Sequence, residues 1–163
     1  YTWVIRGTPL LLQLFFVVYG LPILFGQFFL MDELVGALIT FIINYTAYFI
    51  EIFRGGINSI HKGQFEAAEM LHLSKRQTFM HVILPQTFKK VLPTITNEAI
   101  TLIKDTALVS AVAISDLLRN TREKVMQDFR VEAYLVAAVV YLCLTYIMIR
   151  IFKQIERKYA YYR

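Results

Sequence analysis

Residues 54–88 read RGGINSIHKGQFEAAEMLHLSKRQTFMHVILPQTF and separate two long apolar stretches of the chain. Connections between neighbouring helices usually take about two to eight residues, so a polar segment of this length is too long for a passive turn. We therefore expect the segment to have structure of its own. The least specific interpretation is a pair of juxtamembrane helices that rest on lipid headgroups.

Two short helices are predicted within this segment. Apolar side chains recur with helical spacing over residues 60–71, which is typical of a short amphipathic helix. Ser74 is followed three residues later by Gln77, the pattern of a capping box at the start of a second helix, which Pro85 would close. The two helices should meet at a bend near His72.

The composition of the whole chain is that of a membrane protein. Of its 163 residues, 57% are hydrophobic and 18% are charged, whereas soluble domains have about 25% charged residues. Uncharged runs cover residues 7–31, 34–50 and 133–149, and a helix needs about 20 predominantly apolar residues to cross a bilayer. These values argue against a soluble enzyme and predict several membrane-spanning helices.

Four spans are predicted in one transmembrane domain that covers residues 1–163. The first carries Pro9 and Pro22 near its ends, where proline does little harm to a helix. A polar, helix-compatible stretch at residues 115–130 precedes the fourth span and is expected to lie at the interface. The abrupt start at Tyr1 predicts that an N-terminal segment is missing. The expected fold class is all-α integral membrane, and the four spans are residues 8–29, about 34–53, about 91–115 and about 133–149.

The distribution of Lys and Arg predicts how the chain is oriented. With residues 54–88 in the cytoplasm, 12 of the 17 Lys and Arg residues lie on that side and 4 on the other, while Lys104 lies within a span. Cytoplasmic loops of membrane proteins carry such an excess of positive charge. The net charge of +5 is therefore explained by topology, and no nucleic acid partner is predicted.

The string around Glu66 resembles the EAA loop of ABC importer permeases. The family pattern is Glu-Ala-Ala, three residues, Gly, nine residues, Ile, any residue, Leu-Pro, and this chain has Glu66-Ala67-Ala68, His72 and Val82-Ile83-Leu84-Pro85 at those positions. His72 replaces a glycine at the bend, but histidine adopts a positive φ more often than most residues, so we expect the bend to persist. The segments YTWVIRGTPLLLQLFF, NYTAYFIEIFRGGINSIHKGQFEAA and NEAITLIKDTALVSAVAISDL are similar to the polar amino acid subfamily of these permeases, which has one more span before the first.

The resemblance implies a type I ABC importer permease-like helical bundle and a function. The chain would be one subunit of a permease pair, with an identical or related second subunit, that imports a polar amino acid across the cytoplasmic membrane of a prokaryote. Two separate ATP-binding subunits would hydrolyse ATP with Mg²⁺, because this sequence has no Gly-x-x-x-x-Gly-Lys-Ser/Thr phosphate loop. An extracytoplasmic binding protein would deliver the substrate. No cofactor is expected in this chain itself.

The resemblance also implies which residues couple the chain to its ATPase. In the family the Glu-Ala-Ala helix docks into a groove of the ATPase, where small alanines permit close approach and the glutamate can pair with a basic residue. We call residues 54–88 the coupling loop. Its predicted coupling residues are Gly63, Gln64, Glu66, Ala67, Ala68, His72, Leu84 and Pro85.

Polar side chains inside the predicted spans indicate a substrate path. Each ionised group near the bilayer centre costs about 2.5 to 3.5 kcal/mol on insertion scales, so such groups should face protein or water. Polar residues recur at i, i+3, i+7 on the third span and at i, i+4, i+7 on the second. The two stripes could line one cavity, whose net acidic character favours a cationic or neutral polar amino acid. The predicted path residues are Asn44, Tyr48, Glu51, Asn97, Glu98, Thr101, Lys104 and Asp105.

Alternatives to these roles are open at this point. Lys104 and Asp105 could neutralise each other near the outer headgroups, and Glu51 could pair with Arg54 at the inner interface. A secondary amino acid transporter or channel would explain the polar stripes without an ATPase, but would leave the long loop unexplained. A membrane enzyme would need convergent catalytic groups. No catalytic or metal-binding set is predicted, because the three histidines are spread along the loop with no carboxylate partner in view.

Overall fold

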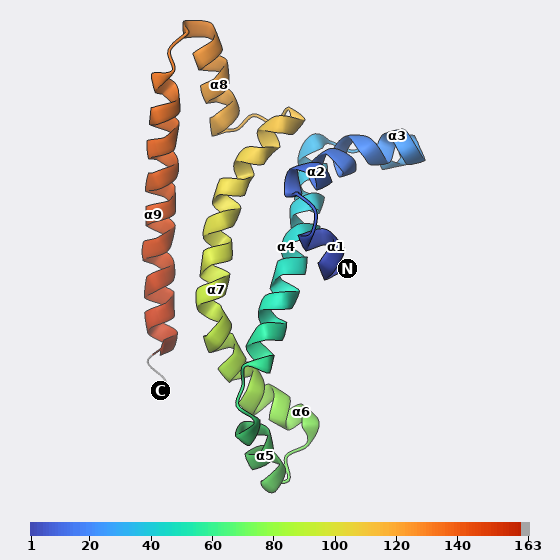
Figure 1. Cartoon of the computed structure of the whole chain (residues 1–163), viewed down its shortest axis with the longest axis vertical. Coiled ribbons are helices and arrows are strands. Elements are labelled where there is room, and N and C mark those ends of the chain that lie inside the picture. The colour runs from blue at the N-terminus through green and yellow to red at the C-terminus, as the bar shows by residue number, and fades with distance from the viewer. Residues whose placement is uncertain (161–163) are drawn as a thin grey trace.

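Three long helices give the molecule its shape. The computed structural model describes residues 1–160, with the side chains of residues 1–158. All regular secondary structure in this part of the chain is helical. Helices α4 (Glu33–Asn58), α7 (Leu84–Asp105) and α9 (Glu132–Ala160) run along the long axis of the molecule (Figure 1). Helix α7 contacts α4 on one side and α9 on the other, so it is the central element.

Two of these helices have the length and composition of membrane spans. They are α4 and α9, which confirm the second and fourth predicted spans and extend beyond their predicted ends. Helix α7 confirms that the third predicted span is a helix, although it ends at Asp105 rather than at Ser115. Because α7 contains several charged residues, it is not apolar enough to count as a membrane span by composition. Those charged residues need contacts inside the protein.

The first predicted span is a helix, but it is shorter than the predicted residues 8–29, because one apolar helical run covers Leu10–Phe25. This run consists of α2 (Leu10–Phe15), the π-helical turn η1 (Phe16–Gly20) and α3 (Leu21–Phe25), and the separate 3₁₀ segment η2 (Gln27–Phe29) follows it. Helix α1 (Thr2–Arg6) precedes them and ends at Gly7. Figure 1 shows α2 and α3 lying across the start of α4 rather than along it.

Backbone conformation sets both ends of this helical run. Pro9 is extended, with φ −62° and ψ 135°, so α1 cannot continue into α2. Gly26 has φ +86°, a conformation that only glycine adopts readily, and it ends α3. The two prolines do little harm to this helix, as predicted, because Pro9 directly precedes its first residue and Pro22 lies in the first turn of α3. Helices α1 and α2 point in different directions on either side of Pro9 (Figure 1).

The coupling loop contains the two predicted helices and the predicted bend. Helix α5 (Lys62–Met70) is followed by α6 (Lys75–Gln77), which opens with the predicted capping box: Ser74 N–H donates to Gln77 Oε1 at 2.9 Å and Gln77 N–H donates to Ser74 Oγ at 3.3 Å. Both helices lie at one end of the molecule, beyond α4 and α7 (Figure 1).

The prediction that Pro85 closes the second helix is wrong. Helix α6 continues through the π-helical segment η3 (Thr78–Ile83) directly into α7. In this wider turn Leu84 N–H donates to Phe79 O, five residues back, which shifts the hydrogen-bond register just before Pro85. Proline has no N–H group to donate, and it is tolerated where the backbone hydrogen bonds of the helix have already shifted in register. The helix therefore continues through Pro85.

At the opposite end of the molecule, the helix expected within residues 115–130 is confirmed. Helix α8 (Leu117–Asp128) follows the 3₁₀ segment η4 (Thr106–Val112) and packs against α9. Its N-terminus is capped by Asp116, whose carboxylate accepts hydrogen bonds from the N–H groups of Leu118 and Arg119 at 3.3 and 2.9 Å. This capped helix leads away from the loop end, and the chain turns back toward that end at the start of α9 (Figure 1).

Two contacts fix α4 within the molecule. At the end far from the loop, an apolar cluster of Leu14, Val18, Ala37 and Val112 joins the N-terminal segments to α4 and η4. At the loop end, Gly56 lies so close to α7 that a Cβ there would sit 2.2 Å from Cγ1 of Val91. Helices α4 and α7 therefore cross at a glycine, next to the coupling loop.

We expect Gly56→Ala to lower the stability of the protein in detergent by about 1 to 3 kcal/mol, because the added methyl group overpacks the crossing. The measurement is the midpoint of thermal unfolding. Gly55→Ala is the matched control, since a Cβ at Gly55 meets nothing within 4 Å. Equal stability of the two variants would show that the crossing is not tight.

Candidate functional site

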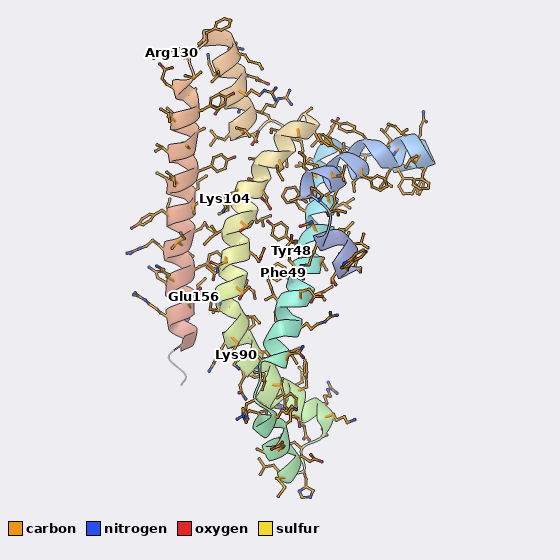
Figure 2. The ribbon with its side chains drawn as sticks, viewed as in Figure 1. Tyr48, Phe49, Lys90, Lys104, Arg130 and Glu156 are labelled. Carbon is orange, nitrogen blue, oxygen red and sulfur yellow. The ribbon has the colours of Figure 1, made fainter. Side chains whose placement is uncertain are left out.

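A polar cavity of about 440 Å³ lies where the N-terminal segment meets α4 and α7. The structure brings five of the eight predicted path residues into its wall, so stripes on both helices face one space. Tyr48 lies on α4 at the level of α1 (Figure 2). The wall is formed by Arg6, Gly7, Thr8, Pro9, Leu10, Asn44, Tyr45, Tyr48, Glu98, Thr101 and Asp105.

Three predicted path residues lie outside this wall. Glu51 lines a neighbouring cavity of about 460 Å³, which it shares with Arg6 and Tyr48. Asn97 and Lys104 are exposed on an adjoining face of α7, and Figure 2 shows Lys104 in the half of α7 far from the loop. These two residues do not belong to the cavity.

Of the two ion pairs considered as alternatives, the structure contains Glu51–Arg54 and not Lys104–Asp105. Glu51 Oε1 lies 3.0 Å from Arg54 Nη1, so this pair exists at the loop-side end of α4. Asp105 accepts a 2.8 Å hydrogen bond from the hydroxyl of Tyr45 and has no ion pair with Lys104 among the described residues. The carboxylate of Asp105 thus joins α7 to α4 instead of neutralising its neighbour in the sequence.

Gln13 connects the N-terminal segment to the wall of the cavity. Its Nε2 group donates to Ile5 O at 2.7 Å and to Thr8 Oγ1 at 2.7 Å, and its Oε1 atom accepts from Asn44 Nδ2 at 2.9 Å. Asn44 is buried, with 4% of its surface exposed. A lone glutamine in the apolar run LLLQLFF was the available signal, because polar side chains in apolar helices usually bond to another helix.

Arg6 is a charged wall residue that the sequence did not single out for the substrate path. Its guanidinium carbon lies 5.2 Å from the centre of the Tyr48 ring, and its Nη1 atom lies 4.0 Å from Glu51 Oε2. From its position in the sequence, Arg6 is one of the 12 Lys and Arg residues assigned to the cytoplasmic side. The structure instead places this cation against α4, where it lines both polar cavities.

The bend of the coupling loop has the predicted positive φ. His72 has φ +54°, in the left-handed region. Its N–H donates to Glu69 O at 2.8 Å, and Leu73 N–H donates to Ala68 O at 3.1 Å, which together form a Schellman motif at the end of α5. Histidine therefore replaces the family's glycine without loss of the bend.

The predicted coupling residues divide into exposed and internal groups. Glu66 and Ala67 are exposed on α5, whereas Ala68 is only 2% exposed and packs inside the chain. The expectation that Ala68 offers a docking surface is therefore corrected. Gln64 Oε1 accepts from Gln86 Nε2 at 2.9 Å, which links α5 to α7.

The remaining coupling residues position these helices. Gly63 N–H donates to Nδ1 of His61, which caps the start of α5. Leu84 is half-buried and Pro85 is exposed where η3 passes into α7. The loop is thus bonded directly to the helix that carries Glu98 and Asp105.

Comparison with known proteins identifies the family. Residues 1–161 match the family described as binding-protein-dependent transport system inner membrane component. This chain belongs to that family. It is therefore a transmembrane component of an ABC transport system, which favours the importer over a secondary transporter or channel.

Two relatives of this family member are named as amino acid permeases. The chain is 40% identical over 159 residues to the arginine transport system permease protein ArtQ of Bacillus subtilis, covering 97% of this chain and 72% of that protein. It is 38% identical over 156 residues to the glutamine transport system permease protein GlnP of Escherichia coli K12, covering 95% and 71%.

A solved structure confirms the expected fold. The family member matches a structure described as "Crystal structure of an amino acid ABC transporter with histidines", with a TM-score of 0.88 and 34% sequence identity. The match covers 97% of this chain and 73% of the other. The N-terminal helices, α4, α7 and α9 therefore belong to the permease fold that the sequence indicated.

We expect Gln13→Met to lower stability by about 1 to 3 kcal/mol, because it leaves the buried Asn44 amide without its partner. Asn44→Leu should also destabilise the protein, and the double variant should lose less than the sum of the two. Thermal unfolding in detergent measures all three. Gln27→Met, at an exposed position of η2, is the control, and additive losses would argue against a direct Gln13–Asn44 interaction.

Proposed function

We propose that this chain forms the path by which a polar amino acid crosses the cytoplasmic membrane of a prokaryote, and that the path includes the cavity between α4 and α7. The observation that carries the proposal is the cavity wall itself, where Glu98, Thr101 and Asp105 of α7 face Asn44 and Tyr48 of α4. The relatives named for arginine and glutamine transport support an amino acid as the substrate.

The charges of the cavity favour a cationic or neutral substrate. Lys104 lies outside the wall and Arg6 lies within it, so the wall holds two carboxylates and one cation. An ammonium or guanidinium group of a substrate can replace the water that the carboxylates would otherwise bind. An acidic amino acid would bring a third carboxylate into the same space and is disfavoured.

Energy for transport comes from a partner. ATP and Mg²⁺ bind to two ATPase subunits outside this chain, a second permease subunit completes the membrane part, and an extracytoplasmic binding protein delivers the amino acid. The coupling loop contacts the ATPase through the exposed side chains of Glu66 and Ala67. The excess of Lys and Arg at the loop side supports a cytoplasmic position for this end of the molecule.

We expect Glu98→Gln to weaken import of a cationic amino acid by about 1 to 3 kcal/mol relative to a neutral one, because it removes a charge-assisted hydrogen bond and keeps the shape. Uptake into vesicles that contain the binding protein and the ATPase measures this difference. Glu156→Gln is the matched control, since Glu156 lies on α9 away from the cavity (Figure 2). An unchanged rate and affinity for every substrate would place the path elsewhere.

We expect Ala67→Trp to reduce substrate-stimulated ATP hydrolysis at least several-fold, because a bulky side chain on the exposed face of α5 overpacks a close interface. Membrane insertion should stay normal. Gln127→Trp, on the exposed surface of α8 at the other end of the molecule, should leave hydrolysis unchanged. Normal ATPase association and hydrolysis in Ala67→Trp would contradict docking through this face.

A further inference from the structure

One face of α9 changes from apolar to basic along its length. Spacings of three and four residues keep side chains on the same face of a helix. Such spacings connect three apolar residues, each more than half exposed, with three exposed basic residues nearer the C-terminal end. We call this the outer face of α9, and it consists of Val139, Leu142, Tyr146, Arg150, Lys153 and Arg157.

The outer face points away from the rest of the protein. Helix α9 packs against α7 and α8 with its other side, where Ala137 is only 5% exposed and Tyr141 and Met148 are half-buried. Figure 2 shows several nitrogen-bearing side chains on the side of α9 away from α7, near its C-terminal end. The outer face is therefore open along both its apolar and its basic part.

The basic residues of the outer face have no ion pair within the described part of the chain. The guanidinium carbon of Arg150 lies 6.0 Å from the centre of the Tyr146 ring, which leaves its N–H groups available to an anion. Other cations at the same end are already bound within the protein, since Arg54 pairs with Glu51 and Lys90 donates to Ser59 O. The cations of the outer face thus have the capacity to bind an anion from outside.

The position of these cations along α9 matches the level of lipid headgroups. From Glu132 at its start to Arg150, the helix rises about 27 Å at 1.5 Å per residue. The hydrocarbon core of a bilayer is about 30 Å thick. When the apolar part of α9 crosses this core, Arg150 and the basic residues after it lie in the headgroup layer on the side of the coupling loop, with Tyr146 at the boundary.

The two parts of the outer face match one kind of occupant. A cytoplasmic protein can reach the basic part but not the apolar part, which lies within the membrane. A second copy that docked through the same face by two-fold symmetry would place two rows of cations at the same membrane depth, where they repel each other. An anionic phospholipid has acyl chains for the apolar part and a negative phosphate for the basic part.

We propose that the outer face of α9 binds an anionic phospholipid of the cytoplasmic leaflet. Its acyl chains lie along Val139 and Leu142, and its headgroup phosphate is held by Arg150, Lys153 and Arg157. This assignment goes beyond the proposed function, because it does not require the cavity to be the substrate path. It also differs from the general excess of cytoplasmic positive charge, because it assigns the lipid to one face of one helix.

The test is photocrosslinking to the complete transporter, full-length permease with its ATPase, in nanodiscs of phosphatidylcholine. The probes are phosphatidylglycerol and phosphatidylcholine with the same photoreactive acyl chain, and crosslinked peptides are mapped by mass spectrometry. We expect phosphatidylglycerol to label the outer face about 10- to 100-fold more than phosphatidylcholine. Arg150→Gln, Lys153→Gln and Arg157→Gln should each lower that preference about fivefold. The double variant Arg150→Lys with Arg157→Lys should keep most of it, because it retains the charge.

The matched control is the triple variant Lys62→Gln, Lys75→Gln and Arg76→Gln, which removes three exposed cations of the coupling loop from the same end of the molecule. It should leave the preference unchanged. If it lowers the preference as much as the combined α9 substitutions do, the attraction belongs to the whole surface and the proposed site is wrong. Equal labelling of α9 by the two lipids would show that the face does not recognise an anion. If neither lipid labels the outer face, protein covers it in the transporter and the proposal fails.

Discussion

The close crossing of α4 and α7 at Gly56 is the contact on which the rest of the structure depends. The absence of a side chain there lets Val91 approach the backbone of α4, and Thr87 packs beside it. Lys90 Nζ donates to Ser59 O at 2.6 Å and ties the end of α4 to α7 (Figure 2). A glycine crossing brings two helices together by van der Waals packing, which matters in a bilayer because lipid supplies no hydrophobic force between them.

From this crossing the two helices extend side by side to the polar cavity, where hydrogen bonds replace apolar packing. Tyr45 and Asp105 join α4 to α7, and Asn44 and Gln13 join α4 to the N-terminal segment. Polar groups without water need such partners, since an unsatisfied group in an apolar environment costs several kcal/mol, on the order of 2 to 7. The same bonds leave Arg6 and Glu98 as the ionised wall residues without a hydrogen-bonded partner among the described side chains.

The coupling loop is built as a rigid unit and not as a flexible connection. A Schellman motif at His72, a capping box at Ser74 and the Gln64–Gln86 hydrogen bond fix α5 against the start of α7. Because η3 leads into α7 without a break, the coupling loop and α7 are joined by continuous hydrogen-bonded helical backbone. The same helix carries Glu98 and Asp105, so the loop and the cavity are two ends of one element.

The sequence alone determined the helical class, the positions of α4 and α9, the two loop helices and the bend at His72. These features follow from local rules: apolar length, the capping pattern of Ser74 and Gln77, and the fact that histidine adopts a positive φ more often than most residues. The two polar stripes were also visible, because helical spacing depends only on neighbours along the chain.

Only the tertiary structure decided which polar groups meet. Pro9 redirects the first apolar segment, and this change of direction brings Arg6 and Gln13 to α4 and into contact with the cavity wall. Pro85 does not end its helix, because a π-helical turn shifts the hydrogen-bond register in front of it. Ala68 is buried and Lys104 is exposed for the same reason. The surroundings of a side chain depend on how whole helices cross, and contacts between residues far apart in the chain set those crossings.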